Sequence, residues 1–69
     1  MSEKEWFNKG VELGKLRRHK EAIKAFEKAI EINPQYAEAW VNKGFCLGEL
    51  GIDEEAIKAF EKAIEINPQ

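Results

Sequence analysis

Apolar residues recur along the chain with the period of an α-helix. Within residues 21–33 they follow the spacing i, i+1, i+4, i+7 and i+8 of one helix face, at Ala22, Ile23, Phe26, Ala29 and Ile30. The segment before it carries a second apolar stripe, at Trp6, Gly10, Leu13 and Leu16. Both stripes return further along the chain. The pattern therefore predicts four helices, over residues 3–16, 20–33, 37–50 and 54–67.

The second half of the chain repeats the first with an offset of 34 residues. The segment EAIKAFEKAIEINPQ occurs at 21–35 and again, unchanged, at 55–69. Of the 33 pairs between residues 3–35 and 37–69, 22 are identical, which requires duplication or design. Pro34 marks the boundary between two hairpins, because the residue before a proline is pushed out of the helical region. We expect either a fragment of a longer repeat protein or an engineered short array.

The helix starts differ between the two copies. Ser2 and Glu5 have the spacing of a capping box, and Asp53 is expected to cap the last helix. The turn of the first copy reads LRRHK and opposes the helix dipole, whereas that of the second reads LGIDE and suits it. Two interpretations of the basic turn remain open. It is a solvated turn, or it attracts the acidic turn of its neighbour.

A 34-residue helix-turn-helix unit with these letters resembles the tetratricopeptide repeat family, whose pattern is W-x2-L-G-x2-Y, then A-x3-F, an alanine three later, and P. The matches are Trp6, Gly10, Ala22, Phe26, Ala29 and Pro34, then Trp40, Gly44, Ala56, Phe60, Ala63 and Pro68. Lysine replaces the family's leucine at Lys9 and Lys43, and leucine replaces its tyrosine at Leu13 and Leu47. The resemblance implies an all-α fold, an α-solenoid segment of four antiparallel helices. We expect a single domain over 1–69, with repeats at 3–36 and 37–69.

Composition narrows the class of protein. The chain is 43% hydrophobic and 35% charged, with a net charge of -2, which gives no basic footprint for nucleic acid. It contains no apolar run of roughly 20 residues and no signal-peptide stretch, so we expect no membrane partner and a cytoplasmic location. Cys46 and His19 are the only cysteine and histidine. We therefore expect no metal, no cofactor and no catalytic residue. Cys46 is interpreted as a packing residue, and His19 as an exposed turn residue, so the protein is not expected to be an enzyme.

The resemblance also implies a concave groove lined by the first helix of each repeat. Its expected lining residues are Lys4, Phe7, Asn8, Val11 and Lys15, then Glu38, Val41, Asn42, Phe45 and Glu49. The sequence does not indicate the family's clamp for a terminal carboxylate, because its apparent counterparts here are apolar. Asn8 and Asn42 either bond a peptide backbone or satisfy local polar groups. The predicted function is non-catalytic binding of a polypeptide whose identity the sequence does not indicate.

Two further expectations concern packing. Trp6 and Trp40 begin the apolar stripes and are predicted to be core residues, and Gly10 is small enough to let a helix approach closely. Gly14 and Gly48 indicate a need in packing or in groove clearance. At the end of the chain an apolar stripe should lack part of its cover, at Ala56, Ile57, Phe60 and Ile64. We therefore expect self-association, and the alternative function is a structural self-assembling unit without a specific ligand.

Overall fold

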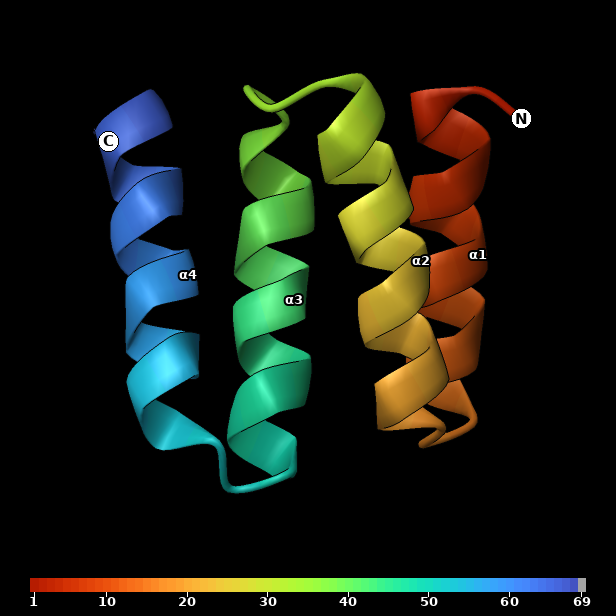
Figure 1. Cartoon of the computed structure of the whole chain (residues 1–69). Helices are drawn as coiled ribbons and strands as arrows, with labels where there is room; N and C mark the ends of the chain where they lie inside the picture. The colour runs from red at the N-terminus through yellow and green to blue at the C-terminus, as the bar shows by residue number, and fades with distance from the viewer. Residues whose placement is uncertain (69) are drawn as a thin grey trace.

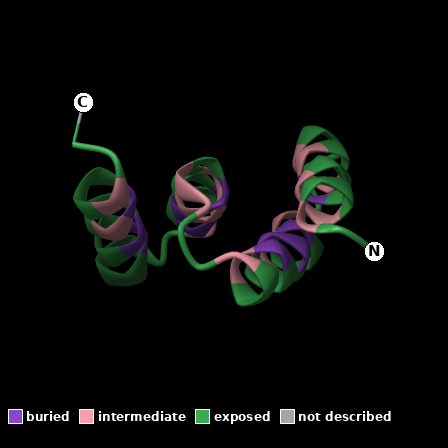
Figure 2. Cartoon of the chain, turned by 90° about the horizontal axis from the view of Figure 1, so that it is seen from above, coloured by how far each residue is buried: buried purple, intermediate pink, exposed green. Residues whose placement is uncertain are grey.

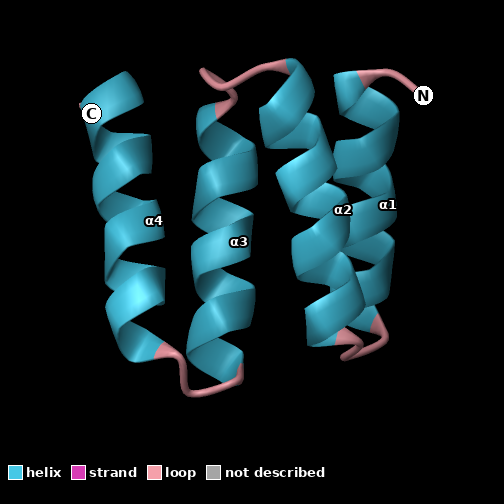
Figure 3. Cartoon of the chain, in the orientation of Figure 1, coloured by secondary structure: helices cyan, strands magenta, loops and turns pink. Residues whose placement is uncertain are grey.

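Four α-helices form the fold, as a computed structural model that describes residues 1–68 shows (Figures 1 and 3). They are α1 (Glu3–Lys15), α2 (His19–Ile32), α3 (Ala37–Glu49) and α4 (Asp53–Ile66). The prediction of an all-α helical repeat is confirmed. Each helix ends one residue earlier than predicted, and α2 and α4 also begin one residue earlier. These shifts are the same in both copies, so the repeat holds in three dimensions.

The helices form a slab of 28 × 28 × 17 Å in which each packs against its neighbours in the chain. Within the described residues, α2 packs against both α1 and α3, whereas α4 packs against α3 alone. Buried residues gather on the inward sides of α2, α3 and α4, and the outer side of α4 is exposed (Figure 2). The chain thus has one covered second helix, α2, and one half-covered second helix, α4.

Of the two helix caps that the sequence predicts, only the one at the N-terminus of α1 is present in the described structure. The Ser2 hydroxyl accepts a hydrogen bond from the Glu5 backbone at 3.1 Å, and Glu5 Oε1 accepts one from the Ser2 backbone at 2.8 Å. These bonds from Ser2 hold the pKa of the Glu5 carboxyl below its usual value. The prediction that Asp53 caps α4 was wrong. Asp53 is the first residue of the helix, Ile52 holds the capping position, and in the described structure neither α2 nor α4 has a side-chain cap.

Each hairpin closes around a glycine that faces a phenylalanine ring. A Cβ on Gly10 would lie 2.5 Å from Phe26 Cε1, and one on Gly44 would lie 2.8 Å from Phe60 Cε1. Both distances are too short for any real contact. The expected close approach at Gly10 is therefore confirmed, and the same contact recurs in the second hairpin. By contrast, a Cβ on Gly14 or Gly48 would meet nothing within 4 Å, which excludes a packing need in the described structure.

The turn before each second helix requires a left-handed residue. Gly51 takes this conformation with φ 77°, and Arg17, at the same repeat position, takes it with φ 61°. Glycine adopts it freely, whereas the Cβ of arginine crowds the backbone. Arg17 Nη2 also lies 3.7 Å from Glu49 Oε1 at the end of α3. The Arg17 and Glu49 side chains are 78% and 37% exposed, so this ion pair contributes little and does not decide between the two interpretations of the basic turn.

The core contains small side chains around one phenylalanine. Ala22, Phe26 and Cys46 form one buried cluster, and Leu47, Ala56 and Ala59 form another. The prediction that the tryptophans are core residues holds in part, because Trp6 and Trp40 are half-buried and Trp40 packs against the second cluster. Lys9 Nζ and Lys43 Nζ lie 5.5 and 5.3 Å from the centres of the Trp6 and Trp40 rings. Trp40 Nε1 also donates to the Pro34 carbonyl at 3.0 Å, so its polar end stays at the surface.

Candidate functional site

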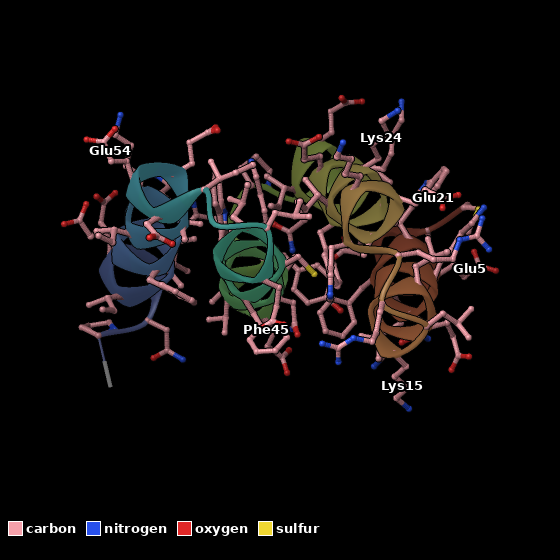
Figure 4. The ribbon with its side chains drawn as sticks, turned by 90° about the horizontal axis from the view of Figure 1, so that it is seen from below. Glu5, Lys15, Glu21, Lys24, Phe45 and Glu54 are labelled. Carbon is pink, nitrogen blue, oxygen red and sulfur yellow. The ribbon has the colours of Figure 1, made fainter. Side chains whose placement is uncertain are left out.

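A hollow of about 260 Å³ lies on the face that α1 and α3 share. Its lining residues are Gly10, Val11, Gly14, Lys15, Phe26, Asn42, Phe45 and Cys46. Lys15 and Phe45 project on the same side of the molecule, opposite Lys24 and Glu54 (Figure 4). We call this surface the α1–α3 groove. It brings together Val11, Lys15, Asn42 and Phe45, which the sequence analysis placed in one groove.

The chemistry of the α1–α3 groove is mainly apolar. Phe45 is 57% exposed although its ring has no polar atom, and Val11 is half-buried beside it. The Asn42 side chain donates from Nδ2 to the Glu38 carbonyl at 2.8 Å, one turn earlier in the same helix. That bond fixes the amide and leaves its oxygen to accept a further hydrogen bond. The open space beside Gly14 is part of the same hollow, which is consistent with groove clearance rather than packing.

A second hollow, of about 480 Å³, lies between α3 and α4. Its lining residues are Ala37, Glu38, Val41, Asn42, Phe60, Ala63, Ile64 and Asn67. The sequence analysis placed Glu38 and Val41 in the groove, and Phe60 and Ile64 in the self-association surface. The structure brings these two sets together, so the groove of repeat 2 continues onto α4.

Phe7 lies in a different environment from its groove neighbours. Its ring stacks on Tyr36 with centroids 5.1 Å apart and meets the Phe26 ring at 5.7 Å. The corresponding residue of repeat 2, Val41, is exposed at the second hollow. Tyr36 is thus a residue that the sequence analysis missed. It directly precedes α3, and its burial, with Glu38 and Glu3 nearby, raises the pKa of its hydroxyl.

The other expected site residues lie outside the two hollows or contribute to them only in part. Lys4 and Asn8 are exposed and line neither hollow, and Glu49 is engaged with Arg17. Of the self-association set, Ile57, Phe60 and Ile64 are exposed to different degrees. Ala56 is instead buried within the hairpin of α3 and α4. Ala56 therefore supports the exposed stripe from below.

Cys46 and His19 are the two reactive side chains that the sequence analysis singled out. Cys46 is 2% exposed, and burial, with the Glu49 carboxylate adding to it, raises the pKa of its thiol. A raised pKa keeps the thiol protonated and unreactive, which agrees with its interpretation as a packing residue. His19 is the first residue of α2 and is partly buried, so its interpretation as an exposed turn residue was wrong.

Within residues 1–68, no three side chains of metal-binding type gather at one place. In the same part of the chain, no helix has the length and apolarity that crossing a membrane needs.

The tetratricopeptide repeat family model matches residues 3–36 and 37–69, which are the two repeats that the sequence pattern predicts. The chain belongs to the tetratricopeptide repeat family. Its members are non-catalytic scaffold repeats that generally mediate protein–protein interaction. A search of curated proteins finds no match to this chain. The family thus supports a role in protein binding, and the geometry of this tetratricopeptide repeat pair supplies the candidate surfaces.

Proposed function

We propose that this protein binds a polypeptide segment in the α1–α3 groove, without catalysing a reaction. The observation that carries the proposal is the hollow in which Val11, Asn42 and Phe45 meet. These residues come from both repeats, so a bound segment spans the two hairpins. The exposed Phe45 ring offers apolar contact, and the Asn42 oxygen offers an acceptor for a backbone N–H.

Burial of the Phe45 ring is the main source of affinity in this proposal. Lys15 stands at one edge of the hollow, and an exposed cation of this kind adds an attraction that salt screens. An apolar contact does not weaken in this way. Binding should therefore survive moderate salt, while a change in Phe45 should weaken it.

The test uses a random peptide library displayed on phage and selected on the full chain. Selected peptides are then measured by fluorescence polarisation against the parent, Phe45→Glu and Leu16→Glu. Leu16 is the matched control, because it is 64% exposed and lies outside the lining of the hollow. We expect Phe45→Glu to weaken binding by roughly tenfold or more, and Leu16→Glu to leave it unchanged. Equal binding by Phe45→Glu, or binding that moderate salt abolishes, would contradict the proposal.

A second candidate function is self-association through α4, because Ile57 and Ile64 are 55% and 60% exposed on its outer side. Apolar patches of this kind mark association surfaces. This candidate predicts a molecular mass that rises at high concentration in analytical ultracentrifugation, and an Ile64→Lys variant in which that rise is suppressed. A well-folded parent that stays monomeric over a wide concentration range would rule out this candidate.

A further inference from the structure

The outer side of α4 carries an apolar stripe that nothing in the described structure covers. We call Ile57, Phe60 and Ile64 the α4 face, and the hollow of about 480 Å³ adjoins it. Even the Phe60 ring, which packs into its own hairpin at Gly44, remains 37% exposed. The α4 face thus exposes large side chains in a row along one helix.

The first repeat shows what covers the same row of residues. Residues 21–33 and 55–67 have identical sequences, so Ile23, Phe26 and Ile30 correspond to the α4 face. Phe26 is only 1% exposed, because α3 brings Cys46 onto it. Ile23 packs against the cluster that contains Leu47 of α3. The interface between α2 and α3 is therefore a template for the helix that fits the α4 face.

Three features of α3 make it fit this row. Ala39 and Cys46 are small, and both are buried where α3 meets its neighbours. Lys43 Nζ lies 3.2 Å from Glu27 Oε2, so a lysine of α3 meets a glutamate of α2. Tyr36 precedes the first turn of α3 and stacks on Phe7. In repeat 2, Glu61 corresponds to Glu27 and Val41 corresponds to Phe7. These two residues would therefore meet the lysine and the aromatic ring of a helix on the α4 face.

The first helix of a second copy lacks two of these features. In α1 the positions of Ala39 and Cys46 are held by Glu5 and Glu12, and both carboxylates are exposed. Packing α1 onto the α4 face would bring these carboxylates against apolar side chains, and burying an unpaired charge is strongly unfavourable. Ser2 replaces Tyr36 and takes part in the capping box. Head-to-tail stacking of copies is therefore disfavoured.

Pairing of two α4 helices is also a poor fit. It would set large residues against large residues, and it would offer Glu61 no lysine at the position of Lys43. The α3 helix has the right face, but its own chain already uses it against α2. Within the described residues no helix is free to cover the α4 face, which leaves this surface open to a helix of a partner protein.

The first turn of α4 adds a requirement that α2 does not have. The end of α3, at Leu50, shares a small hollow with the basic residues Arg17, Arg18, His19 and Lys20. Glu49 at this end of α3 pairs with Arg17. At the start of α4 the corresponding stretch contains Asp53 and Glu54 and no cation. A helix on the α4 face should therefore carry a cation, not a glutamate, in its last turn. In α1, Lys15 meets this requirement and Lys9 corresponds to Lys43, but exposed ion pairs contribute too little to offset the burial of two carboxylates.

We propose that the α4 face binds an amphipathic helix of a partner protein. This helix has small residues at the positions of Ala39 and Cys46 and a lysine at that of Lys43. It also has an aromatic residue before its first turn and a cation in its last turn. This inference rests on the protein-binding role proposed above but uses a different surface. Apolar contact along Ile57, Phe60 and Ile64 supplies the affinity, and Glu61 and the acidic first turn select the partner.

The chain itself provides the probes for the test. The first is a synthetic peptide of residues 35–50 with Cys46→Ala to prevent oxidation, and the second adds Glu49→Lys. The third is a peptide of residues 1–16, which has the helix pattern of α1 but Glu5 and Glu12 in place of the small residues. Each peptide is titrated into the full chain, with fluorescence polarisation for affinity and methyl NMR to locate binding.

We expect the first peptide to bind and the peptide of residues 1–16 to show at least roughly tenfold weaker affinity. Glu49→Lys should strengthen binding about two- to fivefold at low salt, and high salt should remove this gain. The protein variant Ile64→Lys should lose roughly tenfold, whereas Leu16→Lys should bind like the parent. The methyl signals of Ile57 and Ile64 should shift while those of Ile23 and Ile30 stay in place.

Several results would overturn this inference. Equal binding by the peptide of residues 1–16 would show that α1 of a second copy fits as well. Shifts at Ile23 and Ile30 would show that the peptide displaces α3 and does not dock on α4. A parent that dimerises through Ile64 and binds neither peptide would make a second copy the occupant. The variant Phe45→Glu separates the two proposals, because it should abolish binding in the α1–α3 groove and leave binding of these peptides intact.

Discussion

The helices α2 and α4 share one sequence from residue 21 and residue 55 onward, yet they have different surroundings. Phe26 is almost fully buried, whereas more than a third of Phe60 is exposed. Ile23 and Ile30 are half-buried, whereas Ile57 and Ile64 are exposed. The difference arises because α3 covers α2 and the described chain offers no helix to cover α4. Burial in a repeat fold is thus a property of the neighbour as much as of the sequence.

The strongest way to measure this difference is the same truncation at both phenylalanines. Phe26→Ala should lower the free energy of unfolding by about 3–5 kcal/mol, as a large core truncation does. Phe60→Ala should have an effect smaller by about 1–2 kcal/mol, because part of its ring is already in water. Chemical denaturation monitored by circular dichroism compares the two. Equal losses would mean that α3 adds nothing to the stability of α2.

A substitution at the facing glycines tests the same comparison from the other side of each ring. Gly10→Ala should destabilise the protein by about 1–3 kcal/mol, because Phe26 is held by Cys46 and has nowhere to move. Phe60 has open space on its outer side, so it can shift when Gly44→Ala adds a methyl group. The higher helix propensity of alanine, about 1 kcal/mol, then offsets the crowding. Thermal unfolding should show a clear loss for Gly10→Ala and little change for Gly44→Ala, and the reverse order would contradict the comparison.

The turns that lead into α2 and α4 offer a third pair of equivalent positions at which the two repeats can be compared. Arg17→Gly should raise the stability by about 1 kcal/mol, because glycine takes the left-handed conformation without steric strain. Gly51→Ala should lower it by about 1–2 kcal/mol for the same reason. Urea denaturation of both variants checks the pair. If Arg17→Gly lowers the stability, the ion pair between Arg17 and Glu49 stabilises the protein by more than the left-handed conformation of Arg17 costs.

The smallest expected effect concerns the lysines on the tryptophan rings. Lys43 pairs with Glu27 of the covering interface, whereas Lys9, at the same repeat position, faces no previous repeat in the described structure. Lys43→Met should lower the stability by up to about 1 kcal/mol more than Lys9→Met, and 1 M salt should reduce this difference. Parallel thermal melts at low and high salt test it. A difference that salt does not change would exclude the ion pair as its cause.

The sequence predicts most of this fold because the chain carries the repeat pattern twice. The apolar stripes give four helices, and Gly10 predicts a close approach that Gly44 repeats. The helices α1 and α3 end one residue before the prediction because Arg17 and Gly51 turn the chain earlier than the apolar pattern alone suggests. Asp53 has the right chemistry for a cap, but it is already the first residue of the helix, and Ile52 holds the capping position.

The candidate site is less predictable, because it depends on which residues meet across the repeats. Val11, Asn42 and Phe45 do meet at one hollow, as helical spacing and the family pattern suggest. Phe7 leaves that surface because Tyr36 stacks on it, and the repeat pattern gives no hint of this contact, since Ser2 occupies the equivalent position. Trp6 and Trp40 look like core residues by spacing. Nevertheless, the indole of Trp40 bonds the Pro34 carbonyl at the surface, and both rings lie under a lysine.

Native-state hydrogen exchange compares α2 and α4 most directly. Residues 23–33 and 57–67 have the same neighbours in sequence, so their amides exchange at the same intrinsic rates, and any difference in protection reports the surroundings alone. Fewer buried apolar contacts favour local opening. We predict that amides around Phe60 and Ile64 are protected roughly tenfold or more weakly than those around Phe26 and Ile30. Equal protection in the two helices, or stronger protection in α4, would contradict the claim that the neighbouring helix makes the difference.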